Sequence, residues 1–83
     1  MPKTLGDARH EALVAFLIAR RKAAGLTQVE LAARMRVFQS HVSRIEGGER
    51  RIDVVEFIKL GEVLSFDPAT AIRELMGIED DAG

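Results

Sequence analysis

Residues 28–45 read QVELAARMRVFQSHVSRI, and this stretch decides the fold of the chain. Leu31, Ala32 and Met35 recur at helical spacing and predict the buried face of a short helix. A break follows Met35, and a second short helix is predicted from residue 38 or 39 to Glu46. Because the connection between them is so short, the two helices must turn sharply and pack against each other.

The second of these helices has two unlike faces. At about 100° per residue, Phe38, Val42 and Ile45 share one arc, which we expect to face the core. The opposite arc carries amide, hydroxyl and guanidinium groups and no carboxylate: Gln39, Ser40, Ser43 and Arg44, with His41 at its edge. Glutamine can pair with adenine and arginine with guanine, whereas an ordinary solvated helix face usually carries Glu and Lys pairs. This arc therefore favours contacts to DNA base edges.

Capping signals place another helix before this pair. Thr27 and Glu30 have the spacing of a capping box, which opens the first helix of the pair. The earlier helix is predicted from Asp7, as its cap, to about Ala24, with Gly25 as a left-handed stop.

Two more helices are predicted after the pair. Asp53 and Glu56 have the spacing of another capping box, and that helix extends through Leu64. We expect its inner face to comprise Val54, Phe57, Ile58, Leu60 (or Gly61) and Leu64. Asp67 and Pro68 then open a last helix, which reaches about Met76 and is stopped by Gly77.

These signals together predict an all-α fold: a compact bundle of five helices without a convincing strand. We expect a single helix-turn-helix domain over residues 1–83, with its core at about 7–76 and an acidic tail at 77–83.

Composition limits the function. A chain of 83 residues has no room for a two-lobed enzyme, and it has no cysteine and only two histidines. We therefore expect no enzymatic activity, no catalytic residue, no metal site, no cofactor and no small-molecule ligand. No apolar run approaches the length of a membrane helix, so we expect a soluble, cytoplasmic protein.

Charge is segregated along the chain although the net charge is only −1. Residues 20–51 carry eight basic and three acidic side chains, whereas residues 52–83 carry two basic and eight acidic ones. A basic middle beside an acidic end suggests one surface that faces a polyanion.

The sequence resembles the Cro/C1-type, or XRE, family of helix-turn-helix transcriptional regulators. The resemblance is carried by residues 24–32, AGLTQVELA, and 39–51, QSHVSRIEGGERR. It extends through residues 52–56 and the Asp67–Pro68 cap, and covers about residues 10–76. It implies a five-helix, lambda-repressor-like domain whose third helix enters the major groove of double-stranded DNA. The implied function is sequence-specific transcriptional regulation, and we expect the protein to act as a repressor.

The resemblance also implies roles for individual residues. The expected base contacts are Gln39, Ser40, Ser43 and Arg44. Contacts to the DNA backbone are expected from Thr27, Gln28, His41, Arg50 and Arg51, of which His41 could also reach a base edge. Independently of the resemblance, we expect Arg20 to hold a phosphate as well. Arg21 and Glu46 correspond to an ion pair that joins the first and third helices and orients the recognition helix.

Two residues depart from the family pattern. Arg36 stands in the turn where glycine is frequent, so a left-handed backbone there would cost about 1–2 kcal/mol, or the turn would differ. Phe38 stands where Ser, Thr or Pro is frequent, and it cannot cap a helix. We expect its ring to pack inward, although it could instead project and touch a thymine methyl group.

A homodimer on a palindromic operator is expected, because one small helix-turn-helix contacts few base pairs. The fifth helix is the expected interface, with Ile72, Leu75, Met76 and Ile78 as the apolar candidates; Val14 and Ile18 of the first helix are another. The alternative is a protein-interaction module of the same fold, such as an antitoxin or adaptor. A controller protein of a restriction-modification system also fits this size and plan.

Overall fold

The structure, a computed structural model, describes residues 8–79. Over these residues the chain forms five helices and no strand: α1 (Ala8–Ala23), α2 (Gln28–Met35), α3 (Gln39–Glu46), α4 (Val54–Leu64) and α5 (Pro68–Met76). The predicted all-α class is therefore confirmed. The expected cap at Asp7 and the end of the acidic tail lie outside the described residues. None of the five helices is long and apolar enough to cross a membrane.

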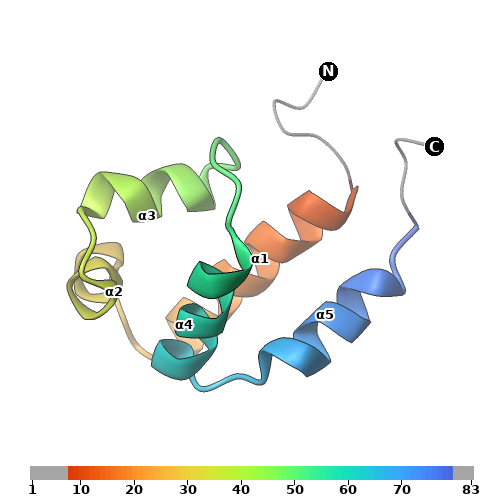
Figure 1. The fold of residues 1–83 in the computed structure, drawn as a ribbon. Helices are drawn as coiled ribbons and strands as arrows, with labels where there is room; N and C mark the ends of the chain where they lie inside the picture. The colour runs from red at the N-terminus through yellow and green to blue at the C-terminus, as the bar shows by residue number, and fades with distance from the viewer. Residues whose placement is uncertain (1–7, 80–83) are drawn as a thin grey trace.

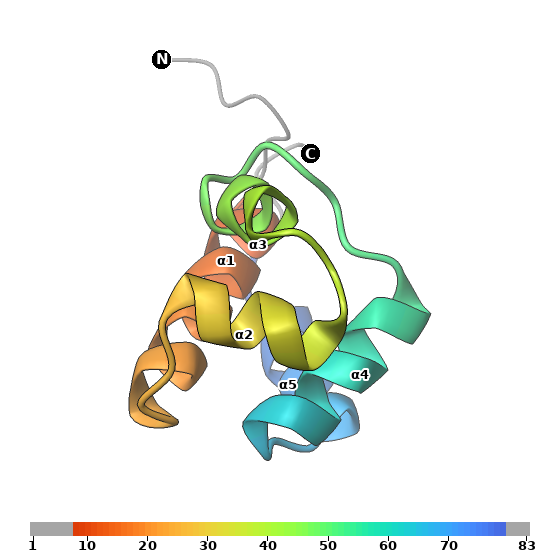
Figure 2. The same cartoon turned by 90° about the vertical axis from the view of Figure 1, so that its left-hand side faces the viewer.

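The helices form a small bundle with α3 and α5 on opposite sides (Figure 1). Turned by 90°, the molecule shows α3 end-on at the top, with α2 crossing beneath its N-terminal end (Figure 2). Helix α2 packs mainly on α3, and α1 contacts both α3 and α5. The two short helices are thus held as one unit on the remaining three.

Local capping explains where α2, α4 and α5 begin. Thr27 Oγ1 accepts the Glu30 backbone N–H at 3.1 Å, and the Glu30 carboxylate accepts the Thr27 N–H at 2.8 Å, so this capping box is complete. Asp53 also caps α4 through the Glu56 N–H at 2.7 Å. At α5, Asp67 caps the helix and Pro68 occupies the first turn. These predicted starts are confirmed because each involves groups only a few residues apart.

The core is built from one apolar side of every helix. Its buried members include Leu17, Leu31, Met35, Val42, Ile45, Phe57, Leu60 and Leu64. Gly61 lies where α4 meets the start of α5, and a Cβ there would come within 2.8 Å of the Phe66 carbonyl oxygen. Glycine is therefore required inside α4, despite its usual cost of about 1 kcal/mol in a helix.

Two expectations about inward faces are wrong. On α4, Val54 and Ile58 are 69% and 46% exposed, because the helix buries only the side formed by Phe57, Leu60, Gly61 and Leu64. Phe38 is 84% exposed and does not pack inward. It lies at the N-cap position with an extended backbone, so the arc calculated for a helical residue does not apply to it.

The turn between α2 and α3 contains a residue in the left-handed conformation, and this residue is not glycine. Arg36 has φ 60° and ψ 44°, and its N–H still donates to the Ala33 carbonyl at 3.2 Å. The Val37 N–H donates to the Ala32 carbonyl at 3.0 Å, and Val37 packs against the core. Arginine therefore adopts the left-handed turn conformation at a conformational cost, and the turn does not change to avoid it.

Candidate nucleic-acid interface

The outer face of α3 presents the side chains that the sequence singled out. Gln39, Ser40, Ser43 and Arg44 are all exposed, while Val42 and Ile45 on the other face are buried. The helix carries no acidic residue in its first turn. An exposed row of amide, hydroxyl and guanidinium groups can donate and accept hydrogen bonds along the edges of base pairs.

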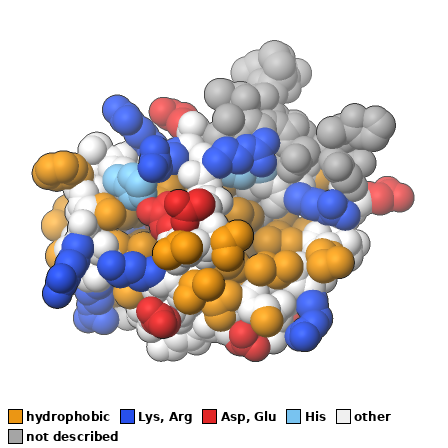
Figure 3. Space-filling model, in the orientation of Figure 1, with side chains coloured by type: hydrophobic (Ala, Val, Ile, Leu, Met, Phe, Trp, Pro, Cys, Tyr) orange, Lys and Arg blue, Asp and Glu red, His pale blue; other side chains and the backbone are white. Residues whose placement is uncertain are grey.

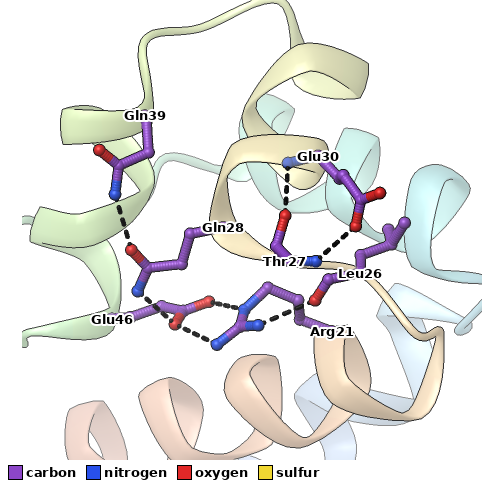
Figure 4. A network of polar contacts seen from close by, with 7 residues as sticks. All are labelled: Arg21, Leu26, Thr27, Gln28, Glu30, Gln39 and Glu46. Carbon is purple, nitrogen blue, oxygen red and sulfur yellow. Dashed lines mark hydrogen bonds and ion pairs between the residues drawn. The ribbon is translucent and has the colours of Figure 1, made fainter.

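A chain of hydrogen bonds runs from the centre of the molecule to the start of α3 (Figure 4). Arg21 of α1 donates from Nε to Glu46 Oε2 at 2.7 Å and from Nη2 to Glu46 Oε1 at 3.0 Å. Gln28 Nε2 donates to Glu46 Oε1 at 2.9 Å, and Gln39 Nε2 donates to Gln28 Oε1 at 2.9 Å. The arrangement joins α1, α2 and both ends of α3, and it fixes the amide of Gln39.

The electrostatics of this chain favour the charged forms. Burial disfavours ionisation of Glu46, but the hydrogen bonds from Arg21 and Gln28 outweigh it and hold the pKa of Glu46 below its usual range. The hydrogen bond to Glu46 raises the pKa of Arg21 further above neutrality. Arg21 also donates to the Leu26 carbonyl at 2.9 Å, which anchors the loop that leads into α2. The ion pair joins α1 to the C-terminal end of α3 and so orients that helix.

His41 lies in a second contact between elements. Its Nε2 is 2.5 Å from Glu56 Oε2 of α4, and its side chain is only 20% exposed. The Glu56 side chain therefore faces α3. The capping box predicted with Asp53 would instead direct this carboxylate back to the Asp53 backbone N–H, so that half of the prediction is wrong. A DNA contact by His41 would require the histidine to leave this carboxylate.

The expected backbone-contacting residues divide by position. Thr27 is exposed at the N-terminus of α2, and Gln28 is half-buried beside it. Arg50 and Arg51 are exposed in the segment between α3 and α4. Helix N-termini and arginines suit phosphate, so both positions are compatible with contacts to the sugar–phosphate backbone.

Arg20 does not belong to this group. Its Nη2 donates to the carbonyls of Leu64 and Ser65 at 3.3 and 2.8 Å, and its guanidinium lies 6.0 Å from the ring centre of Phe66. The cation thus binds the C-terminal end of α4, where free carbonyls attract positive charge. The expectation that Arg20 holds a phosphate does not fit this geometry.

Three of these contacts were not predicted from the sequence. The Gln28–Gln39, Gln28–Glu46 and His41–Glu56 pairs join residues that are 11, 18 and 15 positions apart. No local pattern signals such pairs, because they arise only when α2, α3 and α4 are packed together.

Comparisons with known proteins agree with this geometry. The sequence model of the helix-turn-helix domain matches residues 12–75. An XRE-family like protein from Pseudomonas syringae pv. tomato has a similar structure, with TM-score 0.77 and 45% identity over 83% of this chain and 84% of that one. The chain belongs to the XRE family. This membership makes it a helix-turn-helix transcriptional regulator that binds DNA.

Two further solved structures widen the comparison within this fold. The clp gene regulator ClgR from Corynebacterium glutamicum is 29% identical, with TM-score 0.73 over 92% of this chain and 78% of that chain. The restriction-modification controller protein C.AhdI from Aeromonas hydrophila is 31% identical, with TM-score 0.64 over 77% and 97%. A search of curated protein sequences finds no significant match.

Proposed function

We propose that this XRE-family regulator is a repressor that reads a palindromic operator with the outer face of α3. Gln39, Ser40, Ser43 and Arg44 contact bases. The observation that carries the proposal is the exposed, carboxylate-free face of α3 whose first amide is fixed by the Glu46–Gln28–Gln39 chain. A fixed side chain loses less conformational entropy on binding and so discriminates bases better.

The proposed phosphate contacts are Thr27 and Gln28 at the N-terminus of α2, and Arg50 and Arg51 after α3. His41 takes part only where its contact with Glu56 opens, and Arg20 takes no part. Binding of this kind releases counterions, so the affinity for DNA falls steeply as salt rises. We also propose that the protein acts in the cytoplasm, where such an operator is found, and has no enzymatic activity.

The first test is a selection from a random duplex library with the purified protein at two salt concentrations. A palindromic motif is the expected result. An asymmetric half-site would contradict the dimer, and salt-sensitive binding without a motif would contradict base readout. No binding at low salt would favour the alternative of an antitoxin or adaptor.

The role of Arg44 can be tested on the selected operator. Arg44→Ala should weaken binding by about 1–3 kcal/mol and relax specificity at one base pair in each half-site. Arg34→Ala on the exposed face of α2 is the matched control, and it should leave the selected motif unchanged. Equal weakening on all sequences by Arg44→Ala would make Arg44 a phosphate contact.

We further propose that the protein is a homodimer through α5 and the neighbouring part of α4. A hollow lined by Leu13, Val54, Ile58, Ile72 and Leu75 opens where α1, α4 and α5 meet. Hydrophobic side chains gather over this region of the surface (Figure 3). Exposed apolar groups that gather in one patch favour association.

The similarity to C.AhdI supports one more specific candidate, a restriction-modification controller. Both a simple repressor and a controller would respond to their own concentration, and the genes beside the operator would tell them apart. Reporter expression from the selected operator, with and without the protein, distinguishes repression from activation.

A further inference from the structure

Phe38 is the most exposed large hydrophobic residue between residues 8 and 79. Its side chain is 84% exposed, although the neighbouring Val37 packs against the core. The turn therefore fills its inward position with Val37 and directs the larger ring to solvent. A phenyl ring in this position buries little surface and gains little hydrophobic stabilisation from folding.

Phe38 also provides no side-chain cap for the helix that it precedes. Phe38 is the N-cap of α3, and no side-chain hydrogen bond is made there, whereas α2, α4 and α5 are capped by Thr27, Asp53 and Asp67. Serine at this position would satisfy a free N–H of α3. Folding alone therefore disfavours phenylalanine here, and residues that break local rules in this way mark functional positions.

The position of Phe38 indicates which chemical group of the DNA its ring would meet. Phe38 immediately precedes Gln39, at the end of α3 that lies at the outer edge of the molecule (Figure 1). The N-terminal residues of a recognition helix contact base edges in the major groove. The apolar group exposed in that groove is the C5-methyl group of thymine.

We propose that Phe38 is a specificity-determining residue whose ring contacts a thymine methyl group in each half-site. This inference rests on the proposed base readout by α3 and adds a contact that selects thymine over cytosine and over uracil. The contact is apolar and so complements the hydrogen bonds of Gln39 next to it. Binding buries the ring and the methyl group together, which gives Phe38 the stabilisation that it lacks in the free protein.

The test replaces each thymine of the selected operator by uracil, which removes only the methyl group. One such replacement in a single half-site should weaken binding of the unchanged protein by about fourfold, the value of one buried methyl-sized group. Phe38→Ala should bind more weakly and lose this sensitivity to uracil. Val29→Ala removes another exposed apolar side chain, on α2, and should keep the sensitivity.

Stability measurements separate this role from a structural one. Phe38→Ala should melt at the same temperature as the unchanged protein, and Phe38→Ser should melt about 4 °C higher because serine caps α3. Both variants should nevertheless select a motif with a weaker preference for that thymine. A lower melting temperature for Phe38→Ser would show that the ring serves the fold and would overturn the inference.

The outcomes distinguish this inference from the proposed function. A palindromic motif whose binding is indifferent to uracil at every thymine would overturn the role of Phe38 and leave base readout by α3 intact. The same uracil effect in Phe38→Ala as in the unchanged protein would also overturn it. Absence of any DNA motif would instead refute the proposed function.

Discussion

Arg36 shows how a single residue can carry a backbone conformation that its own chemistry disfavours. Its φ of 60° places the Cβ near the following carbonyl oxygen, which costs about 1–2 kcal/mol for an L-residue. The turn keeps this geometry because Val37 must be directed into the core.

The first prediction concerns this strain. Arg36→Gly should raise the free energy of unfolding by about 1 kcal/mol, or the melting temperature by about 4–8 °C, because glycine adopts a positive φ without strain. The measurement is thermal unfolding followed by circular dichroism. Ala33→Gly, inside α2, is the control and should lower stability by a similar amount. An unchanged or lowered melting temperature for Arg36→Gly would contradict this account of the turn.

A second prediction at the residue scale follows from Glu46. Its folded-state pKa is lowered, so its charge stabilises the fold above the ordinary glutamate pKa. This contribution is lost as pH falls through the lowered value. Glu46→Gln should reduce stability at neutral pH by about 1–3 kcal/mol, because Arg21 loses its charged acceptor.

Urea denaturation at several pH values between about 6 and 3 checks this prediction. The difference in stability between the original protein and Glu46→Gln should shrink as the pH falls, since both then carry a neutral group at that position. Glu30 and Asp67 also have lowered pKa values and affect both proteins equally. A difference that is independent of pH would contradict the charge-based explanation.

At the scale of elements, arginines of one helix hold the ends of others. Arg20 of α1 binds the carbonyls at the end of α4, and Arg9 of α1 donates to the Ile78 carbonyl beyond α5 at 2.9 Å. Phe66 packs edge-on against Phe16, with ring centres 4.9 Å apart, and completes the turn that Arg20 covers. Helix α1 therefore organises the side of the bundle opposite α3.

This arrangement predicts separate effects for two arginines that the sequence alone treats alike. Arg20→Ala should lower stability by about 1–2 kcal/mol and leave the DNA affinity of the folded protein unchanged. Arg50→Ala should leave stability unchanged and reduce the slope of log affinity against log salt by about 1. Thermal unfolding and binding titrations at several salt concentrations measure both. A reduced salt slope for Arg20→Ala would show that Arg20 contacts DNA and would contradict this prediction.

At the scale of the whole molecule, the surface proposed to bind DNA differs in chemistry from the surface proposed to form the dimer. The outer face of α3 is polar and basic, whereas exposed hydrophobic side chains gather where α1, α4 and α5 meet. A two-fold axis through the apolar surface would leave both copies of α3 free to enter successive major grooves.

The dimer prediction is tested by a charge in the apolar surface. Ile72, which is 42% exposed on α5, should accept glutamate without unfolding the chain, but a dimer interface cannot bury that charge without a partner. Sedimentation equilibrium should find Ile72→Glu monomeric and the original protein dimeric at micromolar concentration. Val29→Glu, on α2, should remain dimeric. Monomers in the original protein at that concentration would refute the dimer.

Features set by neighbours along the chain were predictable. The caps at Thr27, Asp53 and Asp67 and the left-handed stop at Gly25 involve groups a few residues apart, so local sequence determines them. The buried faces of α2 and α3 follow from helical periodicity for the same reason.

The sequence by itself therefore determined five helices, the starts of α2 to α5 and the polar composition of the face of α3. Tertiary structure decided which neighbour each side chain meets: Arg20 meets the end of α4, His41 meets Glu56, and Phe38 meets solvent. Periodicity gives the direction of a side chain around its own helix, but burial depends on whether another element covers that direction. That coverage is set only when segments distant in sequence pack together.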